Sequence, residues 1–358
     1  MKYEYWFANI KGITNSRKIE IRKKFQSAEE LFNIEEKELE RLEVVERERQ
    51  IILEGTKQWN AEREYQKVME KGVRCVSIWD AEYPKKLKEI HTPPYMLYVK
   101  GRLPDESKKT AAIVGARECS PYGEVMARAF AERLAGAGVQ IVSGMARGVD
   151  SAGQRGALRA GGTSFGVLGC GVDVCYPREE IGLYMELQER GGVLSEFPIN
   201  TCPLKQNFPA RNRIISGLSD VILVMEAKEK SGSLITADMA LEQGKDVYAL
   251  PGPINSSLSK GCNGLIKQGA GILLSPEELL EELGIFAENL HKKDSQEKIL
   301  LETMENIVYS CLDFKPQNLS ELIRKTKLSV PELLDALVRL ELLGVIKEIS
   351  KNYYVKVK

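Results

Sequence analysis

The feature that most constrains this chain is a regular alternation of apolar runs and amphipathic stretches between residues 111 and 250. Apolar runs without polar alternation are typical of strands buried on both faces, and intervening helices connect such strands in parallel. The alternation therefore predicts an α/β fold with an extended Rossmann-like, doubly wound, mainly parallel sheet. The expected strands are 111–114, 139–142, 164–168, 193–195, 221–225 and 247–250, and the expected helices are 122–135, 150–160, 179–189, 211–218 and 234–243.

A helical segment and a winged-helix segment are expected on either side of this sheet. Residues 1–65 have helical periodicity and predict a small domain of the SAM-like or helix-hairpin-helix-like kind. Residues 296–358 have the pattern of a winged helix, with a helix-turn-helix pair over 319–326 and 330–343 and a hairpin over 345–357. The predicted domains are therefore 1–65, 66–288 and 296–358, with a polar linker over 287–297.

Composition excludes several classes of protein. The 358 residues include 51 basic and 51 acidic side chains, so nucleic-acid binding would have to depend on local patches. Seven cysteines without paired spacing, and only two histidines, predict a reducing cytoplasm and neither disulfides nor a metal site. The start of the chain lacks a signal-peptide pattern, and no apolar run is long enough for a membrane span.

Glycine-rich turns follow four of the predicted strands or open the next helix. Such turns expose backbone N–H groups at the positive end of a helix dipole, and an arginine in the turn adds a donor suited to phosphate. Parallel strands bring these turns to one edge of the sheet, where ligands bind in folds of this class. The candidate residues in these turns are Gly115, Ala116, Arg117, Ser120, Ser143, Gly144, Arg147, Gly148, Gly169, Gly171, Ser231, Gly232 and Ser233.

A basic stretch before the predicted helix at 211–218 supplies the remaining candidates. Between Glu196 and Asp220 there are three cations and no acid. Together with Phe208, these cations suit single-stranded nucleic acid, because cations bind phosphates and an aromatic ring stacks on a base. Phe208 could equally be a core residue beside a proline turn. The candidates here are Lys205, Asn207, Phe208, Arg211 and Arg213.

Three other chemistries fit the residues less well. A dinucleotide site needs Gly-x-Gly-x-x-Gly and a ribose-binding acid, and this chain has neither after its first two strands. The sequence also lacks the P-loop motif that binds nucleotide phosphates. Hydrolysis needs a poised carboxylate or histidine; Asp150 and Glu226 are the candidates, but we expect Asp150 to cap a helix and Glu226 to end a strand. Cys170 between two glycines is more often a packing residue than a nucleophile. No cofactor is expected.

At these residues the chain resembles the DNA-processing protein A (DprA, also called Smf) family over about residues 75–285. The resemblance rests on IVGAR, VSGMARGVD, VLGCGVD, LSEFP, NFPARNRIISGLSD, SGSLITADMA and LSKGCNGLIKQGA. It implies a non-catalytic protein that binds single-stranded DNA without sequence preference. Such a protein shields incoming DNA in natural transformation, promotes RecA loading in homologous recombination and forms a homodimer.

The resemblance also assigns roles to particular residues. It implies phosphate contacts by Arg117 and the turn at 143–148, and a basic and aromatic pocket around Phe208. Ala116 replaces the serine usual in the first turn, and Cys170 replaces a small polar residue in the third. The implied dimer face lies near Leu265, Ile266 and Ile272.

Two other functions stay open at this point. A nucleotide-processing enzyme of the phosphoribohydrolase type could use the same anion site, but its Pro-Gly-Gly-x-Gly-Thr signature is reduced here to Pro251-Gly252-Pro253. A protein adaptor with a vestigial DNA site is the third possibility. The predicted recognition helix of the winged helix carries Glu332, Asp335 and Glu341, which disfavours DNA reading by that domain.

Overall fold

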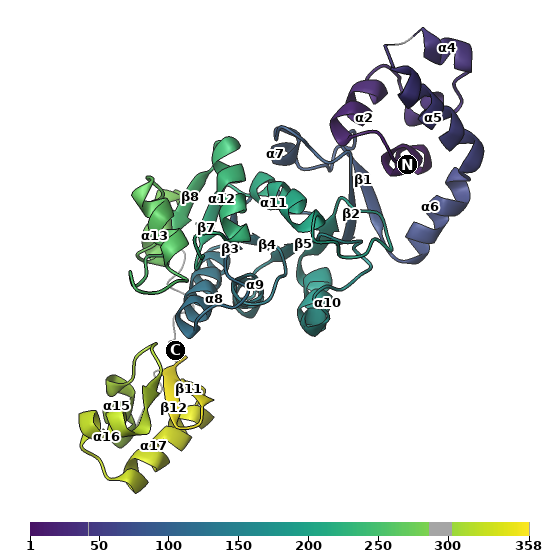
Figure 1. Cartoon of the computed structure of the whole chain (residues 1–358). Coiled ribbons are helices and arrows are strands. Elements are labelled where there is room, and N and C mark those ends of the chain that lie inside the picture. The colour runs from purple at the N-terminus through teal and green to yellow at the C-terminus, as the bar shows by residue number, and fades with distance from the viewer. Residues whose placement is uncertain (42, 286–302, 358) are drawn as a thin grey trace.

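The computed structural model describes residues 1–41, 43–285 and 303–357, and its centre is a nine-stranded sheet (Figure 1). The strand order is β1-β2-β6-β5-β4-β3-β7-β8-β9. The seven strands β3 to β9 run parallel to one another. β1 and β2 form an antiparallel edge beside β6. The strands are β1 (Arg74–Ser77), β2 (Met96–Gly101), β3 (Thr110–Val114), β4 (Gln140–Ser143), β5 (Ser164–Val167), β6 (Gly192–Ser195), β7 (Val221–Val224), β8 (Asp246–Ala249) and β9 (Gly271–Ile272).

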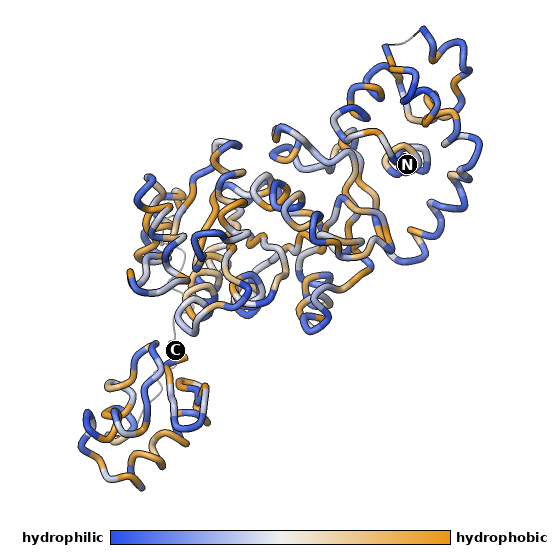
Figure 2. Tube along the Cα trace, viewed as in Figure 1, coloured by the Kyte–Doolittle hydropathy of each residue, from blue (hydrophilic) through white to orange (hydrophobic). Residues whose placement is uncertain are grey.

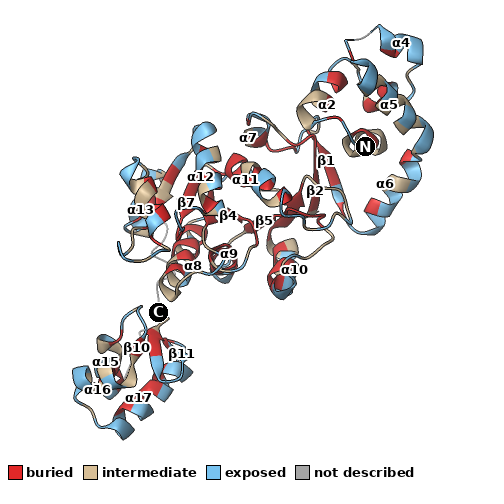
Figure 3. Ribbon diagram, viewed as in Figure 1, coloured by how far each residue is buried: buried red, intermediate tan, exposed pale blue. Residues whose placement is uncertain are grey.

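Helices cover both faces of this sheet. One face packs against α8 (Pro121–Gly136), α9 (Val149–Arg159) and α14 (Pro276–Glu282). The other packs against α7 (Lys85–Lys88), α11 (Asn207–Leu218), α12 (Gly232–Glu242) and α13 (Lys260–Lys267). A 3-10 turn, η1 (Arg178–Glu180), leads into α10 (Ile181–Arg190), which packs near β5 and β6. Figure 3 shows the sheet and the inner sides of these helices as buried.

The strands have the composition that this layering requires. In β3, Ala111 and Ile113 belong to the core on the α8–α9 side, while Ala112 and Val114 belong to the core on the α11–α12 side. Successive side chains of a strand point to opposite faces, so a strand covered on both faces must be apolar at every position. This explains the unbroken apolar runs of the sequence, and the predicted fold class is confirmed.

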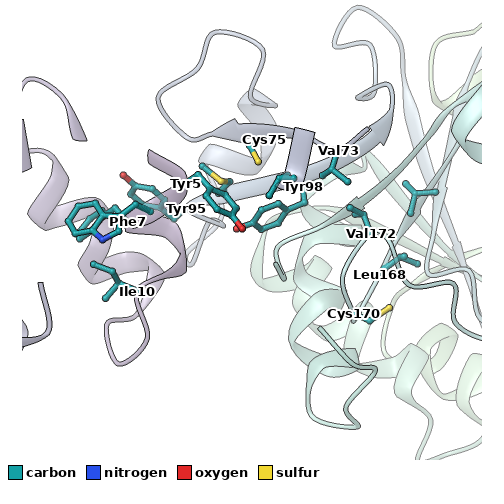
Figure 4. Close-up of a cluster of buried hydrophobic side chains, with 14 of the residues drawn as sticks. Tyr5, Phe7, Ile10, Val73, Cys75, Tyr95, Tyr98, Leu168, Cys170 and Val172 are labelled. Atoms are coloured by element: carbon teal, nitrogen blue, oxygen red, sulfur yellow. The ribbon is translucent and has the colours of Figure 1, made fainter. Parts of the chain in front are cut away.

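The N-terminal helices share a core with the sheet. They are α1 (Lys2–Asn9), α2 (Asn15–Arg22), α3 (Ala28–Phe32), α4 (Glu36–Glu40), α5 (Glu46–Gln58) and α6 (Ala61–Glu70). Figure 4 shows Tyr5 and Phe7 of α1 beside Tyr95 and Tyr98. The rings of Tyr5 and Tyr98 meet edge to face at 6.1 Å. Because α6 runs through the predicted boundary at residue 65 and this core continues into the sheet, the N-terminal helices and the sheet form one packed unit.

Residues 303–357 form a separate small fold of the winged-helix type. Its helices are α15 (Thr303–Cys311), α16 (Leu319–Thr326) and α17 (Val330–Leu342), and its three-stranded sheet has the order β10 (Gln317–Asn318), β12 (Tyr353–Lys356), β11 (Ile346–Ser350). Leu322, Leu333 and Leu337 lie in its core. The predicted linker over 287–297 lies outside the described residues.

One helix differs from the sequence prediction in a way that matters for the site. The helix expected at 211–218 begins at Asn207, so that Phe208 and Pro209 lie in its first turn. Read from the sequence, Pro209 predicts that the helix begins after it. A proline is tolerated in the first turn of a helix, however, because the N–H groups of that turn have no partner within the helix. The basic stretch therefore sits at a helix start.

Candidate nucleic-acid interface

A cleft with a volume of about 670 Å³ lies at the carboxyl ends of β3 and β7. The chain leaves β3 toward β4 and leaves β7 toward β8, so the loops after these two neighbouring strands diverge. A crevice opens at such a switch point in doubly wound sheets. Residues 114–118 form one wall, residues 228–233 form another, and the start of α11 forms the floor.

Four exposed cationic side chains line this cleft: Arg117, Lys205, Lys228 and Lys230. Glu118 and Asp150 are the acidic side chains of the lining, and Asp150 is buried. The sequence prediction included Arg117 and Lys205 but missed the two lysines at 228 and 230. Their signal was the Lys-x-Lys spacing directly before the Ser231-Gly232-Ser233 turn, where a short loop places both residues beside the helix start.

The start of α12 faces the same cleft. Ser231 is its N-cap residue and accepts a hydrogen bond from the Ser233 N–H at 3.4 Å. Ser231, Gly232, Ser233 and Thr236 all line the cleft. The N–H groups of a first helical turn carry the positive end of the helix dipole and have no acceptor within the helix. With the lysines at 228 and 230 beside them, these groups make one side of the cleft attractive to an anion.

Phe208 lies at the centre of an aromatic and cationic cluster in the cleft. Its ring centroid is 5.4 Å from that of Tyr176, and the Arg117 and Arg211 guanidinium carbons lie 5.5 and 5.9 Å from it. The ring rests on Gly169, where an added Cβ would lie 3.0 Å from it. Phe208 is half-buried and Tyr176 is 39% exposed. Tyr176 was missed in the sequence because it follows the third glycine-rich turn by several residues.

Arg211 is buried beneath this cluster and has structural partners. Its Nη1 donates to the carbonyl oxygen of Gly144 at 2.8 Å and to that of Val167. A Cβ on Gly144 would lie 2.5 Å from the guanidinium, so glycine is needed for this approach. Burial lowers the pKa of Arg211 to about 10 and raises the pKa of Asp150, although each charge favours the other. Arg211 thus connects α11 to the loops after β4 and β5.

Several predicted turn residues use their polar groups within the protein. Ser143 Oγ donates to the Ile113 carbonyl at 2.6 Å, and the Gly144 N–H donates to Asp150 Oδ2 at 3.1 Å. Ser120 donates its N–H and its hydroxyl to Glu226, at 2.7 and 2.6 Å. Asn207 Nδ2 donates to the Gly169 carbonyl at 3.0 Å. These bonds fix the shape of the loops that surround the cleft.

Two glycines of the predicted set serve close backbone packing. Gly148 has a φ of 79°, and a Cβ there would lie 2.4 Å from the Ala116 carbonyl oxygen. The Gly171 N–H donates to the Thr201 carbonyl at 3.0 Å. Gly115 and Ala116 line the cleft directly, whereas Gly148 and Gly171 support its walls.

Arg147 and Arg213 lie outside the lining of the cleft. Arg213 binds Glu196 through two hydrogen bonds of 2.6 and 2.7 Å and donates to the Thr92 carbonyl at 2.9 Å, so its guanidinium joins α11 to the loop after β6. Arg147 is exposed, and its nearest described carboxylate is Glu179 at 4.0 Å. The structure therefore groups Arg117, Lys205, Phe208, Arg211 and residues 231–233, and places these two arginines elsewhere.

The three residues expected at a dimer face have different environments. Leu265 is buried in the core against the sheet, Ile266 is half-buried, and Ile272 on the edge strand β9 is 48% exposed. Leu274 directly after β9 is 68% exposed.

Within the described segments, no helix is long and apolar enough to cross a membrane.

Comparison with known proteins identifies the family. The model of DNA recombination-mediator protein A matches residues 74–284, which is more than half of the chain. This chain belongs to that family. The model of the DprA winged helix domain matches residues 293–350. The recognised resemblance and the winged helix are thereby confirmed.

Individual relatives agree with this assignment. Protein Smf of Escherichia coli is 42% identical over 279 residues, which cover 76% of this chain and 74% of the relative. The X-ray structure of DNA processing protein A from Streptococcus pneumoniae matches with a TM-score of 0.68 and 33% identity, over 79% of this chain and 98% of that one. A structure of DNA processing protein A from Helicobacter pylori, described for its single-stranded DNA binding mode, matches with a TM-score of 0.53 and 31% identity, over 60% of this chain and 97% of that one.

Proposed function

We propose that this protein binds single-stranded DNA in the cleft between β3 and β7 and acts as a non-catalytic mediator of recombination. The observation that carries the proposal is the set of four exposed cations that line the same cleft as the half-buried ring of Phe208, with Arg117 against that ring. Cations can bind successive phosphates, and the Phe208 and Tyr176 rings offer stacking surfaces to unpaired bases. The Helicobacter pylori relative, whose structure is described for its single-stranded DNA binding mode, supports the same ligand.

In this proposal the cleft residues have two kinds of task. Arg117, Lys205, Lys228 and Lys230 contact phosphates, together with the backbone amides of Gly115, Ala116 and Gly232. Ser120, Ser143, Gly144 and Arg211 hold the loops in place through the bonds described above. Ala116 keeps its backbone amide, so the absence of a serine hydroxyl at this position removes one contact and no charge.

A binding role agrees better with the carboxylates than a hydrolytic role does. Asp150 accepts the Gly144 N–H, and Glu226 accepts two hydrogen bonds from Ser120. A general base must reach a water or a substrate proton, and these two side chains already serve the loops. Release of free base from nucleoside monophosphates by the purified protein would support the phosphoribohydrolase alternative instead.

The resemblance to the family extends the proposal to partners. We propose that the bound strand is passed to RecA during homologous recombination and natural transformation, and that the protein acts as a homodimer in the cytoplasm. The exposed apolar side chains of Ile272 and Leu274 at the edge of the sheet support self-association there.

Fluorescence anisotropy with a labelled oligo-dT and a duplex of equal length tests the DNA proposal. We expect tighter binding of the single strand, and the logarithm of its affinity should fall linearly with the logarithm of the salt concentration. Equal or absent binding of the two ligands would refute it. The rate at which RecA hydrolyses ATP on the same oligo-dT, with and without this protein, tests the second step. An unchanged rate would refute RecA loading while leaving DNA binding intact.

A further inference from the structure

The outer surface of α17 in the winged helix carries an apolar stripe. Val330, Leu334, Val338 and Leu342 follow one another at intervals of four residues and are 45%, 38%, 54% and 84% exposed. Another side of the same helix supplies Leu333, Ala336, Leu337 and Leu340 to the core. Figure 2 colours most of α17 as hydrophobic, although Figure 3 shows much of it as exposed. The apolar surface of α17 is therefore wider than the part that packs in the core, and the rest of it is exposed to solvent.

The charges on α17 are mainly negative. Glu332, Asp335 and Glu341 are exposed on α17, and Arg339 is its single cation. Arg339 forms an ion pair with Asp335 at 3.1 Å and lies 3.7 Å from Glu305. Two carboxylates of α17 thus remain without a cation on the same helix. Both are held in place, because Glu332 accepts from the Ser329 N–H and hydroxyl and Glu341 accepts from the Glu348 N–H.

This surface does not suit DNA. In a winged helix that reads DNA, the second helix of the helix-turn-helix enters the major groove and presents polar or basic side chains there. Leucine and valine beside carboxylates would meet phosphates with no compensating contact. Apart from Arg339, the basic side chains of the helix-turn-helix lie on α16 and after it, at Arg324, Lys325 and Lys327.

We propose that α17 is a docking surface for a protein helix whose apolar face is flanked by lysine or arginine. The stripe spans about 18 Å along α17, three to four turns, which matches the anchor spacing of an amphipathic helix bound in an apolar surface. Complementary charges set the register and exclude acidic partners. A second copy of this domain would bring the same carboxylates together, so the negative charge favours a basic partner over self-pairing.

The test uses the full chain and two labelled 18-residue helical peptides. Both have leucine at intervals of three and four residues, and the other positions are lysine in one peptide and glutamate in the other. We expect the protein to bind the lysine peptide at least tenfold more tightly. The double variant Leu334→Ser/Val338→Ser should weaken this binding at least fivefold. Equal binding of the two peptides, or no loss in the double variant, would overturn the proposal.

A matched control separates this surface from general stickiness. Ile181 and Met185 on α10 have the same spacing and are each 52% exposed, so Ile181→Ser/Met185→Ser removes a comparable apolar surface elsewhere. This variant should bind the lysine peptide as the unchanged protein does. Glu332→Gln/Glu341→Gln keeps the hydrogen-bond acceptors but removes both charges, and should reduce the preference for lysine. Thermal unfolding of each variant verifies that the fold is intact.

Two further outcomes would assign the surface to another occupant and overturn the proposal. Loss of self-association by Leu334→Ser/Val338→Ser in sedimentation would identify a second copy of this chain. Loss of duplex DNA binding by the same variant, with peptide binding unchanged, would identify DNA. Oligo-dT binding at the cleft should be the same in all these variants, so failure of the cleft proposal and failure of this one are distinguishable.

Discussion

The guanidinium of Arg117 lies over the ring of Phe208, with 5.5 Å between Arg117 Cζ and the ring centroid. Arg117 follows β3 and Phe208 lies in the first turn of α11, so the contact joins one wall of the cleft to its floor. A strand bound there would meet a phosphate donor and a stacking surface side by side. This pairing makes the contributions of charge and stacking separable by mutation.

Removal of a cleft cation should weaken single-strand binding and reduce its salt dependence. Arg117→Ala and Lys205→Ala each remove one phosphate contact in our proposal, so the slope of log affinity against log salt should fall by about 0.7. Affinity at low salt should drop by about fivefold or more. Lys85→Ala is the control, because Lys85 is 82% exposed and lies outside the cleft. Salt-series anisotropy measures both quantities, and slopes equal to that of the control would refute the assignment of these cations.

Truncation of the Phe208 ring should weaken binding by a different route. Phe208→Ala removes a stacking surface worth about 1–3 kcal/mol per base, which corresponds to a loss of roughly 5- to 150-fold. The salt slope should stay as it is in the unchanged protein, because no charge is removed. Phe208→Trp should retain most of the affinity. A reduced slope in Phe208→Ala would mean instead that the ring acts by positioning Arg117.

The fold was predictable because its signal is local, whereas the site depends on pairs that are distant in the sequence. The apolar runs predicted the six parallel strands β3 to β8, since burial on both faces demands continuous apolar residues. The sheet order was not predictable, because an apolar strand such as β7 fits beside many neighbours. The same holds for the N-terminal helices, whose core with Tyr95 and Tyr98 the sequence does not reveal.

Some cations of the predicted site are exposed in the cleft, and others form hydrogen bonds or ion pairs within the protein. Arg117, Arg211 and Arg213 look equivalent in the sequence, yet Arg213 binds Glu196 and Arg211 binds backbone carbonyls. Only folding decides which acceptors lie within reach of a given arginine. Lys228 and Lys230 line the cleft because β3 and β7 are neighbours, although more than 100 residues separate the two strands in the sequence.

Arg211 should matter first for stability. Arg211→Ala leaves the buried carbonyls of Gly144 and Val167 without this donor and removes the charge that favours the buried Asp150 carboxylate, and a buried polar group left unsatisfied costs about 1–3 kcal/mol. Urea unfolding should report a loss of this size. Arg211→Met/Asp150→Asn should recover part of the stability, since it removes both charges. If Arg211→Ala instead unfolds at the normal urea concentration and loses only DNA affinity, Arg211 contacts DNA directly.

Self-association should depend on the exposed side chain of Ile272, whereas the buried side chain of Leu265 should affect the stability of the monomer. Ile272→Glu places a charge on the edge strand, where the side chain is 48% exposed, so the monomer should fold normally but associate at least tenfold more weakly. Leu265→Glu buries a charge in the core and should destabilise the protein itself. Sedimentation equilibrium and thermal unfolding together distinguish the two effects. A dimer unaffected by Ile272→Glu would place the interface elsewhere.

Lys18 should make stability rise with pH in the alkaline range. Its side chain is 4% exposed, it donates to the Ala8 carbonyl near the end of α1, and burial lowers its pKa from 10.5 to about 8. Below pH 8 the lysine is charged in both states, and the folded protein bears the full cost of burying that charge. Between pH 8 and 10.5 the unfolded chain binds more protons than the folded one, so the free energy of unfolding contributed by Lys18 rises, by up to about 3 kcal/mol.

Urea unfolding at pH 7.5 and pH 10 measures this contribution, with Lys18→Met as the variant that cannot titrate. The difference in stability between the unchanged protein and the variant should shift in favour of the unchanged protein at pH 10. The neighbouring Lys23 is exposed, so Lys23→Met should show no such shift and serves as the control. A pH-independent difference for Lys18→Met would show that the buried lysine keeps an ordinary pKa. Water would then reach the end of α1 and solvate the charged side chain.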